Sequence, residues 1–248
     1  MKRLSGAGAD DFAILLNRVR GLGGFPCARD AAQAFVTIIY EHFRESLVLL
    51  RLFATVPYGE LPLPEREFVD RRAEAAGIGH LVTGRTPILT WLGSRGENAD
   101  WQEREKSQRF RCIPLASGTF VASLSMLSAQ FRAISFDPDF VDRWEAAFAG
   151  AGAGRYAGML HVVDAAADRD EQGRMVVPMQ EFVAAHRVRT VLGFGESYGS
   201  HPGLLTLFAF ANETIGRTAA EPLALLLAAY RDFTEEMAAR GHVFAATP

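Results

Sequence analysis

The sequence lacks the features that mark several common protein classes. Its 248 residues include two cysteines, Cys27 and Cys112, and no Cys-x-x-Cys or Cys/His cluster accompanies them. A structural zinc site and a disulfide framework are therefore not expected. No stretch approaches the roughly 18 consecutive apolar residues of a membrane span. The formal net charge is −3 and the basic residues are not clustered, which argues against nucleic acid as a partner.

The amino terminus also lacks the pattern of a signal peptide. A basic pair opens the chain, but Asp10 and Asp11 interrupt the apolar run that follows. What is present is an ordinary globular composition, 49% hydrophobic and 22% charged. We therefore expect a cytoplasmic protein whose two thiols are reduced.

Catalytic signatures are not recognised either. No His-Glu-x-x-His pair occurs, and the glycine-rich segment 150–154 lacks the context of a dinucleotide site. The segment "GFGESYGS" (193–200) is not interpreted as the nucleophile elbow of a serine hydrolase. The sequence thus predicts no catalytic residue and no metal ligand set, and it leaves any cofactor unidentified.

Hydrophobic periodicity predicts the elements of the first half. A helix is expected within residues 1–29, and a second helix is expected to begin at an N-cap Asp30. Residues 46–56 form an apolar run that alternates around Arg51, which is typical of a strand, and residues 86–96 predict another.

A long helical insert, residues 117–154, is expected next. Ser117 is its predicted N-cap, a second helix is expected to start at Asp137 and Pro138, and "AGAGAG" (149–154) predicts a flexible joint.

Three further strands are predicted between residues 156 and 212, with a short helix between the first and second of them. A closing helix is expected over residues 219–239, started by a capping box of Thr218 and Glu221. Sequential strands joined by short turns favour an α+β fold, an antiparallel sheet with helices on one side.

This order of elements resembles a GAF domain, a small-molecule-sensing relative of the PAS fold. The resemblance rests on "VRTVLGFGESY…GLLTLFAFANETIGRTAAEPLALLLAAYRDF" near the end of the chain and on the helix and strand of residues 30–56. "WLGSRGENADWQEREKSQRFRCIPL" is similar to the input regions of bacterial sensor histidine kinases. The resemblance implies one domain over residues 30–240, with an N-terminal segment 1–29 and a tail 241–248. It also implies ligand sensing, a kinase or other signalling output domain, and a homodimer.

The acidic loop "DAAADRDEQGRMVV" (164–177) invites comparison with a calcium-binding loop. An EF-hand register starting at Asp168 places Asp170 at position 3 and Gly173 at position 6. Position 12, which requires a bidentate glutamate, is Met179. We therefore interpret the loop as a polar turn.

Six residues are candidates for a ligand site. Cys112 lies in an apolar segment, and His161 lies in a predicted central strand, on the face opposite Leu160 and Val162. Aromatic side chains with polar tips suit a small-molecule pocket, and Arg side chains near strand ends suit an anion. The candidate set is Trp91, Arg95, Arg111, Cys112, His161 and Tyr198.

Three interpretations remain open at this point. The first is a non-catalytic sensory domain that binds a small molecule between the sheet and the insert. The second is an enzyme or haem-type sensor on the same fold, using Cys112 or His161; GAF-like free methionine sulfoxide reductases use cysteines, and they need a resolving partner. The third is a protein-interaction module without a ligand.

Overall fold

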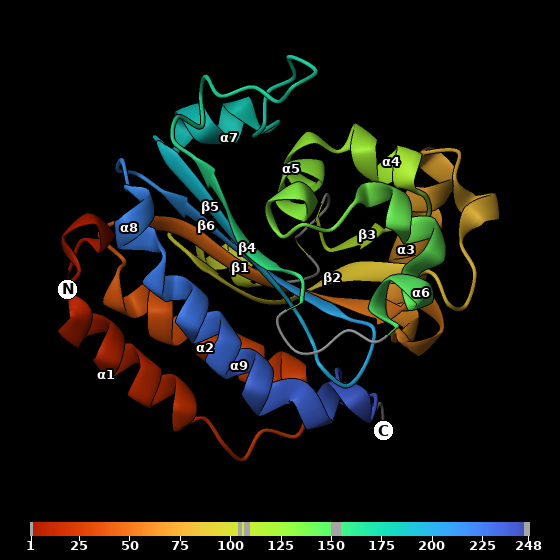
Figure 1. The fold of residues 1–248 in the computed structure, drawn as a ribbon, viewed down its shortest axis with the longest axis horizontal. Coiled ribbons are helices and arrows are strands. Elements are labelled where there is room, and N and C mark those ends of the chain that lie inside the picture. The colour runs from red at the N-terminus through yellow and green to blue at the C-terminus, as the bar shows by residue number, and fades with distance from the viewer. Residues whose placement is uncertain (1, 104–105, 107–109, 150–154, 246–248) are drawn as a thin grey trace.

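The computed structural model describes residues 2–103, 106, 110–149 and 155–245. Its described strands form one antiparallel sheet in the order β3-β2-β1-β6-β5-β4 (Figure 1). The strands are β1 (Leu47–Pro57), β2 (Pro87–Gly96), β3 (Cys112–Pro114), β4 (Ala157–Val162), β5 (Thr190–Ser197) and β6 (Leu204–Ala211). The predicted α+β class is confirmed.

Helices cover both faces of the sheet, which corrects the expectation of helices on one side (Figure 1). The helices are α1 (Ala9–Arg20), α2 (Ala28–His42), α3 (Leu63–Ala75), α4 (Gly118–Ser123), α5 (Ser125–Ala133), α6 (Trp144–Phe148), α7 (Gln180–Ala185), α8 (Arg217–Ala220) and α9 (Pro222–Ala239). Helices α1, α2 and α9 pack on one face, and α4, α5 and α7 lie over the other. Helix α3 packs beside the edge strand β3.

Burial on both faces explains why the central strands are almost wholly apolar. In β1, Leu50 and Leu52 belong to the core beneath α2 and α9, whereas Leu49 and Phe53 belong to the core beneath the insert. The N-terminal segment joins the first of these cores, since Leu15 and Val19 of α1 are fully buried in it.

Strand β4 is an edge strand of the described sheet and not the central strand expected from "MLHVVD". Its apolar sequence is explained by contact with α5, which covers one of its faces. An edge strand that is covered by a helix can therefore have the same apolar sequence as a central strand.

The insert contains shorter helices than predicted. Ser117 is the N-cap of α4, accepting a hydrogen bond from the Phe120 amide at 3.2 Å, but the helix breaks at Leu124, where φ is −92° and ψ is 91°. Asp137 caps a 3₁₀ segment, Pro138–Arg143, that precedes the short α6. The joint expected at 149–154 lies almost entirely outside the described residues.

Two other helix starts differ from prediction. Helix α2 begins one turn earlier than expected, because Cys27 and not Asp30 has the extended N-cap backbone. The Thr218–Glu221 capping box does not form, because Thr218 is already helical within α8 and Pro222 starts α9 as a separate helix.

A close approach between α5 and the sheet fixes the insert. A Cβ atom at Gly158 of β4 would lie 2.1 Å from the Ala133 carbonyl oxygen at the end of α5. Glycine is therefore required here for α5 to reach the strand backbone. Gly195, the partner of Gly158 on β5, sits under Ile134 in the same way, with 2.6 Å between a built Cβ and Ile134 Cγ2.

Candidate functional site

A cavity of about 890 Å³ lies between the sheet and the helices of the insert. Its floor comes from β1, β2, β3 and β6, and its roof comes from α4, α5 and the start of α7. The lining residues are Leu49, Arg51, Phe53, Arg72, Ala76, Leu89, Trp101, Phe110, Cys112, Ile113, Pro114, Phe120, Leu124, Ser125, Met126, Leu127, Pro178, Met179, Gln180, Glu181, Phe182, Phe208 and Phe210. Its size and largely apolar lining are typical of a small-molecule site.

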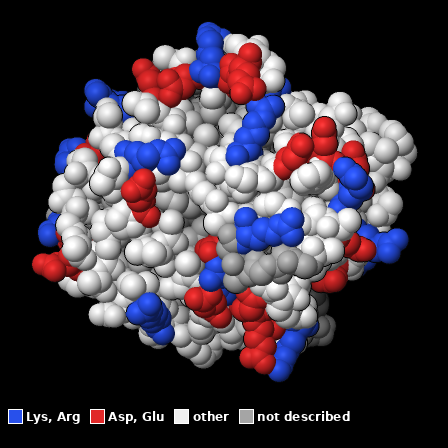
Figure 2. Space-filling model, viewed as in Figure 1, with Lys and Arg blue, Asp and Glu red and all other residues white. Residues whose placement is uncertain are grey.

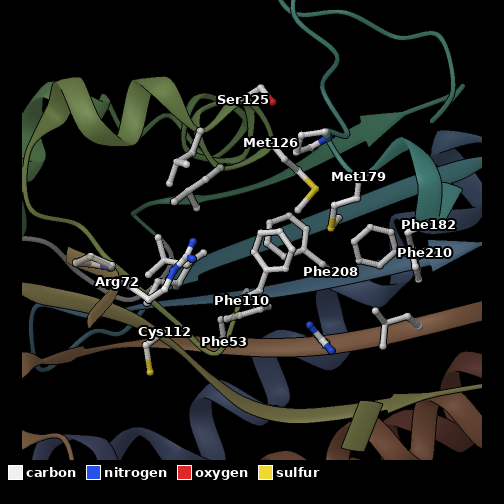
Figure 3. A pocket seen from close by; sticks show the side chains of 18 of the residues that line it. Phe53, Arg72, Phe110, Cys112, Ser125, Met126, Met179, Phe182, Phe208 and Phe210 are labelled. Atoms are coloured by element: carbon white, nitrogen blue, oxygen red, sulfur yellow. The ribbon is translucent and has the colours of Figure 1, made fainter. Parts of the chain in front are cut away.

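Aromatic and thioether side chains dominate one part of this cavity (Figure 3). The rings of Phe53, Phe110 and Phe208 are grouped over the strands, and the sulfur atoms of Met126 and Met179 point toward them from the roof. Methionine side chains adapt to irregular ligand shapes, and aromatic rings offer flat apolar surface. This half of the cavity suits a flat or branched apolar group.

Arg51 places a charge in the middle of this apolar floor. It lies on the central strand β1, directly across from Ser94 of β2 and Phe208 of β6. Its Nε donates a hydrogen bond to Ser94 Oγ at 3.2 Å, and its guanidinium carbon lies 4.9 Å from the centre of the Trp91 ring. Burial lowers the pKa of Arg51 to about 10, so it stays charged at neutral pH.

Among the described residues, no carboxylate lies within 4.0 Å of the Arg51 guanidinium, and its two terminal nitrogens make no hydrogen bond. The described cavity lining holds two other charged side chains, Arg72 of α3 and Glu181 of α7. The cavity therefore combines an apolar wall with a half-buried cation.

Of the six candidate residues, Cys112 lines the cavity, but with its backbone side. Its thiol lies 3.3 Å from Thr90 Oγ1 and belongs to the core on the α2 face, while its neighbour Ile113 faces the insert. Figure 3 shows the sulfur of Cys112 pointing away from the rings of the cavity. The thiol is thus not placed to attack a molecule bound there.

Trp91 and Arg111 lie near the cavity without lining it. Trp91 is 1% exposed, and its ring packs against the guanidinium of Arg51. Arg111 is held by an ion pair of 3.0 Å to the buried Glu65 of α3, with its guanidinium 5.7 Å from the Phe68 ring centre. Trp91 therefore serves as a platform for Arg51, and Arg111 anchors α3 to the sheet.

The other three candidates lie on the α2 and α9 face of the sheet. Arg95 pairs with Glu41 of α2 at 2.6 Å. His161 Nε2 lies 2.8 Å from the Ile215 carbonyl oxygen. Tyr198 is fully buried, its hydroxyl 3.2 Å from Thr234 Oγ1 of α9, and burial raises its pKa above the usual value. None of these three lines the cavity.

The segment 195–199 does match the G-x-S-x-G pattern, with Gly199 as its second glycine, contrary to the sequence interpretation. The structure gives it no elbow, because the next described element is strand β6 and not a helix. Ser197 is the last residue of β5 and fully buried, and its Oγ accepts a hydrogen bond from the Tyr156 amide at 3.2 Å. It is a structural serine.

The acidic loop is a turn in which aspartate side chains accept hydrogen bonds from nearby backbone amides. Asp168 Oδ2 accepts from the Val163 and Asp164 amides at 2.9 and 3.1 Å. Asp170 Oδ1 accepts from the Arg174 amide at 2.9 Å, and its other oxygen lies 2.7 Å from Arg174 Nε. Across the described chain, no three His, Cys, Asp or Glu side chains gather as a metal ion requires.

Arg51 is the residue of the cavity that the candidate set missed. The sequence carries a signal for it, because one arginine interrupts an eleven-residue strand whose other positions are almost all buried. The same pattern predicts the strand. A half-buried charge without a partner among the described residues is costly, which makes Arg51 a candidate functional position.

The surface charge and the hydrophobicity of the helices give less specific information about function than the cavity does. Figure 2 shows basic and acidic side chains interspersed over the described part of one face. Among the described helices, none has the combined length and apolar character that crossing a bilayer requires.

Comparison with known proteins finds similarity to solved structures. No family model matches the chain, and no curated protein matches it. A free methionine-R-sulfoxide reductase from Neisseria meningitidis, solved in complex with its substrate, is similar over 95% of both chains, with 12% identity and a TM-score of 0.47. The GAF domain of an Acinetobacter phosphoenolpyruvate-protein phosphotransferase is similar over 96% of both chains, with 11% identity and a TM-score of 0.46.

The chain is thus an α+β protein whose described strands form one antiparallel sheet, with a cavity under its helical insert. At these identities and TM-scores the two similarities assign no activity or ligand to this chain, so the substrate of the reductase and the role of the phosphotransferase domain are properties of those proteins.

Proposed function

We propose that this protein is a non-catalytic sensory domain that binds a small molecule in the cavity beneath the insert. The observation that carries the proposal is the cavity itself, about 890 Å³ and lined by aromatic, aliphatic and methionine side chains from both the sheet and the insert. Ligand sites of this size and composition bury most of a small ligand's surface.

The placement of the cavity supports a sensing role. A ligand there contacts strands β1 and β6 on one side and α5 and α7 on the other. Strand β1 also packs against α2 on the opposite face of the sheet, so the sheet links the cavity to the helices at the chain termini. A ligand that binds one arrangement of the insert more tightly shifts the population toward that arrangement.

The proposal includes an output beyond this domain. We infer a cytoplasmic regulatory protein of bacterial signal transduction, acting as a homodimer on a kinase or another signalling domain. The terminal helices α1 and α9 pack together on the face away from the cavity and are the elements we assign to that output.

Two measurements test the binding function. The native mass and absorption spectrum of the purified protein report any molecule retained from expression. Titration with N-phenyl-1-naphthylamine, an uncharged aromatic dye that fluoresces in apolar surroundings, then probes the emptied cavity. We expect saturable binding of one dye per chain.

A matched pair of variants locates the dye. Met126→Trp adds volume at the roof of the cavity and is expected to abolish binding. Ile14→Trp adds the same residue on the exposed face of α1, where Ile14 is 52% exposed, and is expected to leave binding unchanged. An apo mass together with no dye binding, or equal binding by both variants, contradicts the proposal.

A further inference from the structure

The charge of Arg51 has no partner among the described residues, although a charge at this half-buried position is energetically unfavourable. It occupies a central strand, between Leu50 and Leu52, which are both fully buried. Taking a guanidinium out of water is unfavourable unless an opposite charge or a full set of acceptors compensates. Ser94 Oγ satisfies only the Nε–H of this group.

The neighbours of Arg51 orient it for a ligand. The hydrogen bond to Ser94 holds one edge of the guanidinium plane, and the Trp91 ring supports it at 4.9 Å. Both terminal nitrogens remain without a hydrogen-bond acceptor among the described residues, and Arg51 lines the cavity. A planar pair of N–H donors fixed in this way matches the two oxygens of a carboxylate or sulfonate.

The remainder of the cavity defines the other half of such a ligand. Phe208 lies directly across from Arg51 on β6, and Phe53 follows two residues later on β1. Of the other two charged side chains in the described lining, Arg72 adds positive charge and Glu181 adds negative charge from the first turn of α7. A small hydrophilic anion would leave the apolar wall unused, and a neutral apolar molecule would leave Arg51 unpaired.

We propose that the cavity selects organic anions, in which a single carboxylate-type group pairs with Arg51 and an apolar, aromatic-sized body fills the space beside Phe53 and Phe208. This inference rests on the proposed binding function and names its ligand class.

Two dyes with the same aromatic body test the inference. 1-Anilinonaphthalene-8-sulfonate carries one anionic group, and N-phenyl-1-naphthylamine lacks it. We expect the anionic dye to bind the wild-type protein at least about tenfold more tightly, the ratio expected for a buried charge-assisted hydrogen-bonded pair. This comparison needs no variant, so it does not depend on the folding of a mutant.

A variant then assigns the preference to Arg51. Arg51→Gln is expected to weaken the anionic dye about tenfold or more and to change the neutral dye less than about threefold. Arg95→Gln removes the same charge on the opposite face, where Arg95 pairs with Glu41, and is expected to leave both affinities near wild type. Circular dichroism and thermal melting verify that each variant is folded.

The outcomes are distinguishable. Equal affinity of the two dyes for the wild-type protein, or an anionic affinity unchanged in folded Arg51→Gln, overturns the anion selectivity and leaves the cavity as a binding site. Failure of both dyes to bind overturns the proposed function itself, and this inference with it.

Discussion

Replacing Gly158 with alanine tests how the insert is attached to the sheet. The added Cβ would lie 2.1 Å from the Ala133 carbonyl oxygen and 3.2 Å from Ile134 Cα. Contacts shorter than 3.0 Å essentially never occur for real Cβ atoms, so the end of α5 must move from 2.1 to at least 3.0 Å, a displacement of about 0.9 Å. The obstacle is backbone, which has no rotamer to change.

The expected loss of stability follows from two opposing effects. Overpacking of this kind costs about 1–3 kcal/mol. Replacing glycine by alanine restores about 0.4–1 kcal/mol by restricting the unfolded chain. We therefore expect Gly158→Ala to lower the free energy of unfolding by about 1–2 kcal/mol, or the melting temperature by about 2–8 °C for a domain of this size.

Urea denaturation followed by tryptophan fluorescence measures the change. Gly23→Ala is the matched control, because a Cβ there meets nothing within 4 Å. Since α5 also carries Met126 and Leu127 at the roof of the cavity, Gly158→Ala should weaken binding of N-phenyl-1-naphthylamine as well. A Gly158→Ala protein as stable as wild type, or a Gly23→Ala protein destabilised equally, would refute the reasoning.

Two further predictions concern a half-buried histidine, His201, and the strained backbone at the end of α5. The His201 ring packs on Tyr198 with 4.4 Å between centroids, and burial lowers its pKa below 6.5 although Glu235 lies 4.0 Å away. As the pH falls, His201 is therefore protonated in the unfolded chain before it is protonated in the folded protein, so the urea midpoint should fall between pH 7 and pH 5. His201→Gln should make the midpoint depend less on pH. The same pH dependence in wild type and variant would contradict this prediction. Ser135 follows α5 with φ of 61°, so Ser135→Gly should raise the free energy of unfolding by up to about 1 kcal/mol, measured as a higher urea midpoint. An unchanged midpoint would exclude strain there.

Much of the fold was predictable because burial leaves a strong imprint on sequence. The apolar runs of β1, β2, β5 and β6 correspond to strands covered on both faces, and the predicted class is confirmed. Helix ends were predicted less well. Ser135 and Arg187 adopt positive φ where glycine is usual, so no glycine marks the chain reversal after α5 or α7.

The sequence also does not predict the break in the insert helix at Leu124. Phe120, Leu124, Leu127 and Phe131 repeat at helical spacing across it, and periodicity cannot show that one residue of the repeat leaves the helical backbone. Tertiary contacts decide such positions. Ser125 Oγ, for example, lies 3.3 Å from the Val176 carbonyl oxygen of the acidic loop, a contact between segments about fifty residues apart.

The candidate site shows why residue type alone is a weak guide. Cys112 and His161 were selected for their chemistry, yet both side chains face the α2 and α9 layer. In a sheet covered on both sides, adjacent residues of a strand point into different cores, so a shift of one position moves a residue from one core to the other. Assigning a candidate to the cavity therefore required knowing which core holds it.

Arg51 differs from the other candidates because its energetic position, and not its reactivity, singles it out. Arg95 and Arg111 have carboxylate partners at 2.6 and 3.0 Å, so the protein itself compensates their charges. Arg51 lies between buried apolar residues of β1 and has no carboxylate partner among the described residues. If the charge served stability, Arg51→Met should lower the melting temperature. If it does not, Arg51→Met should be neutral or stabilising, because an apolar residue of similar length removes a half-buried charge that no described residue compensates. We expect a raised melting temperature in Arg51→Met together with loss of preference for the anionic dye. A residue whose replacement raises the melting temperature and removes the preference for the anionic dye serves ligand recognition and not stability.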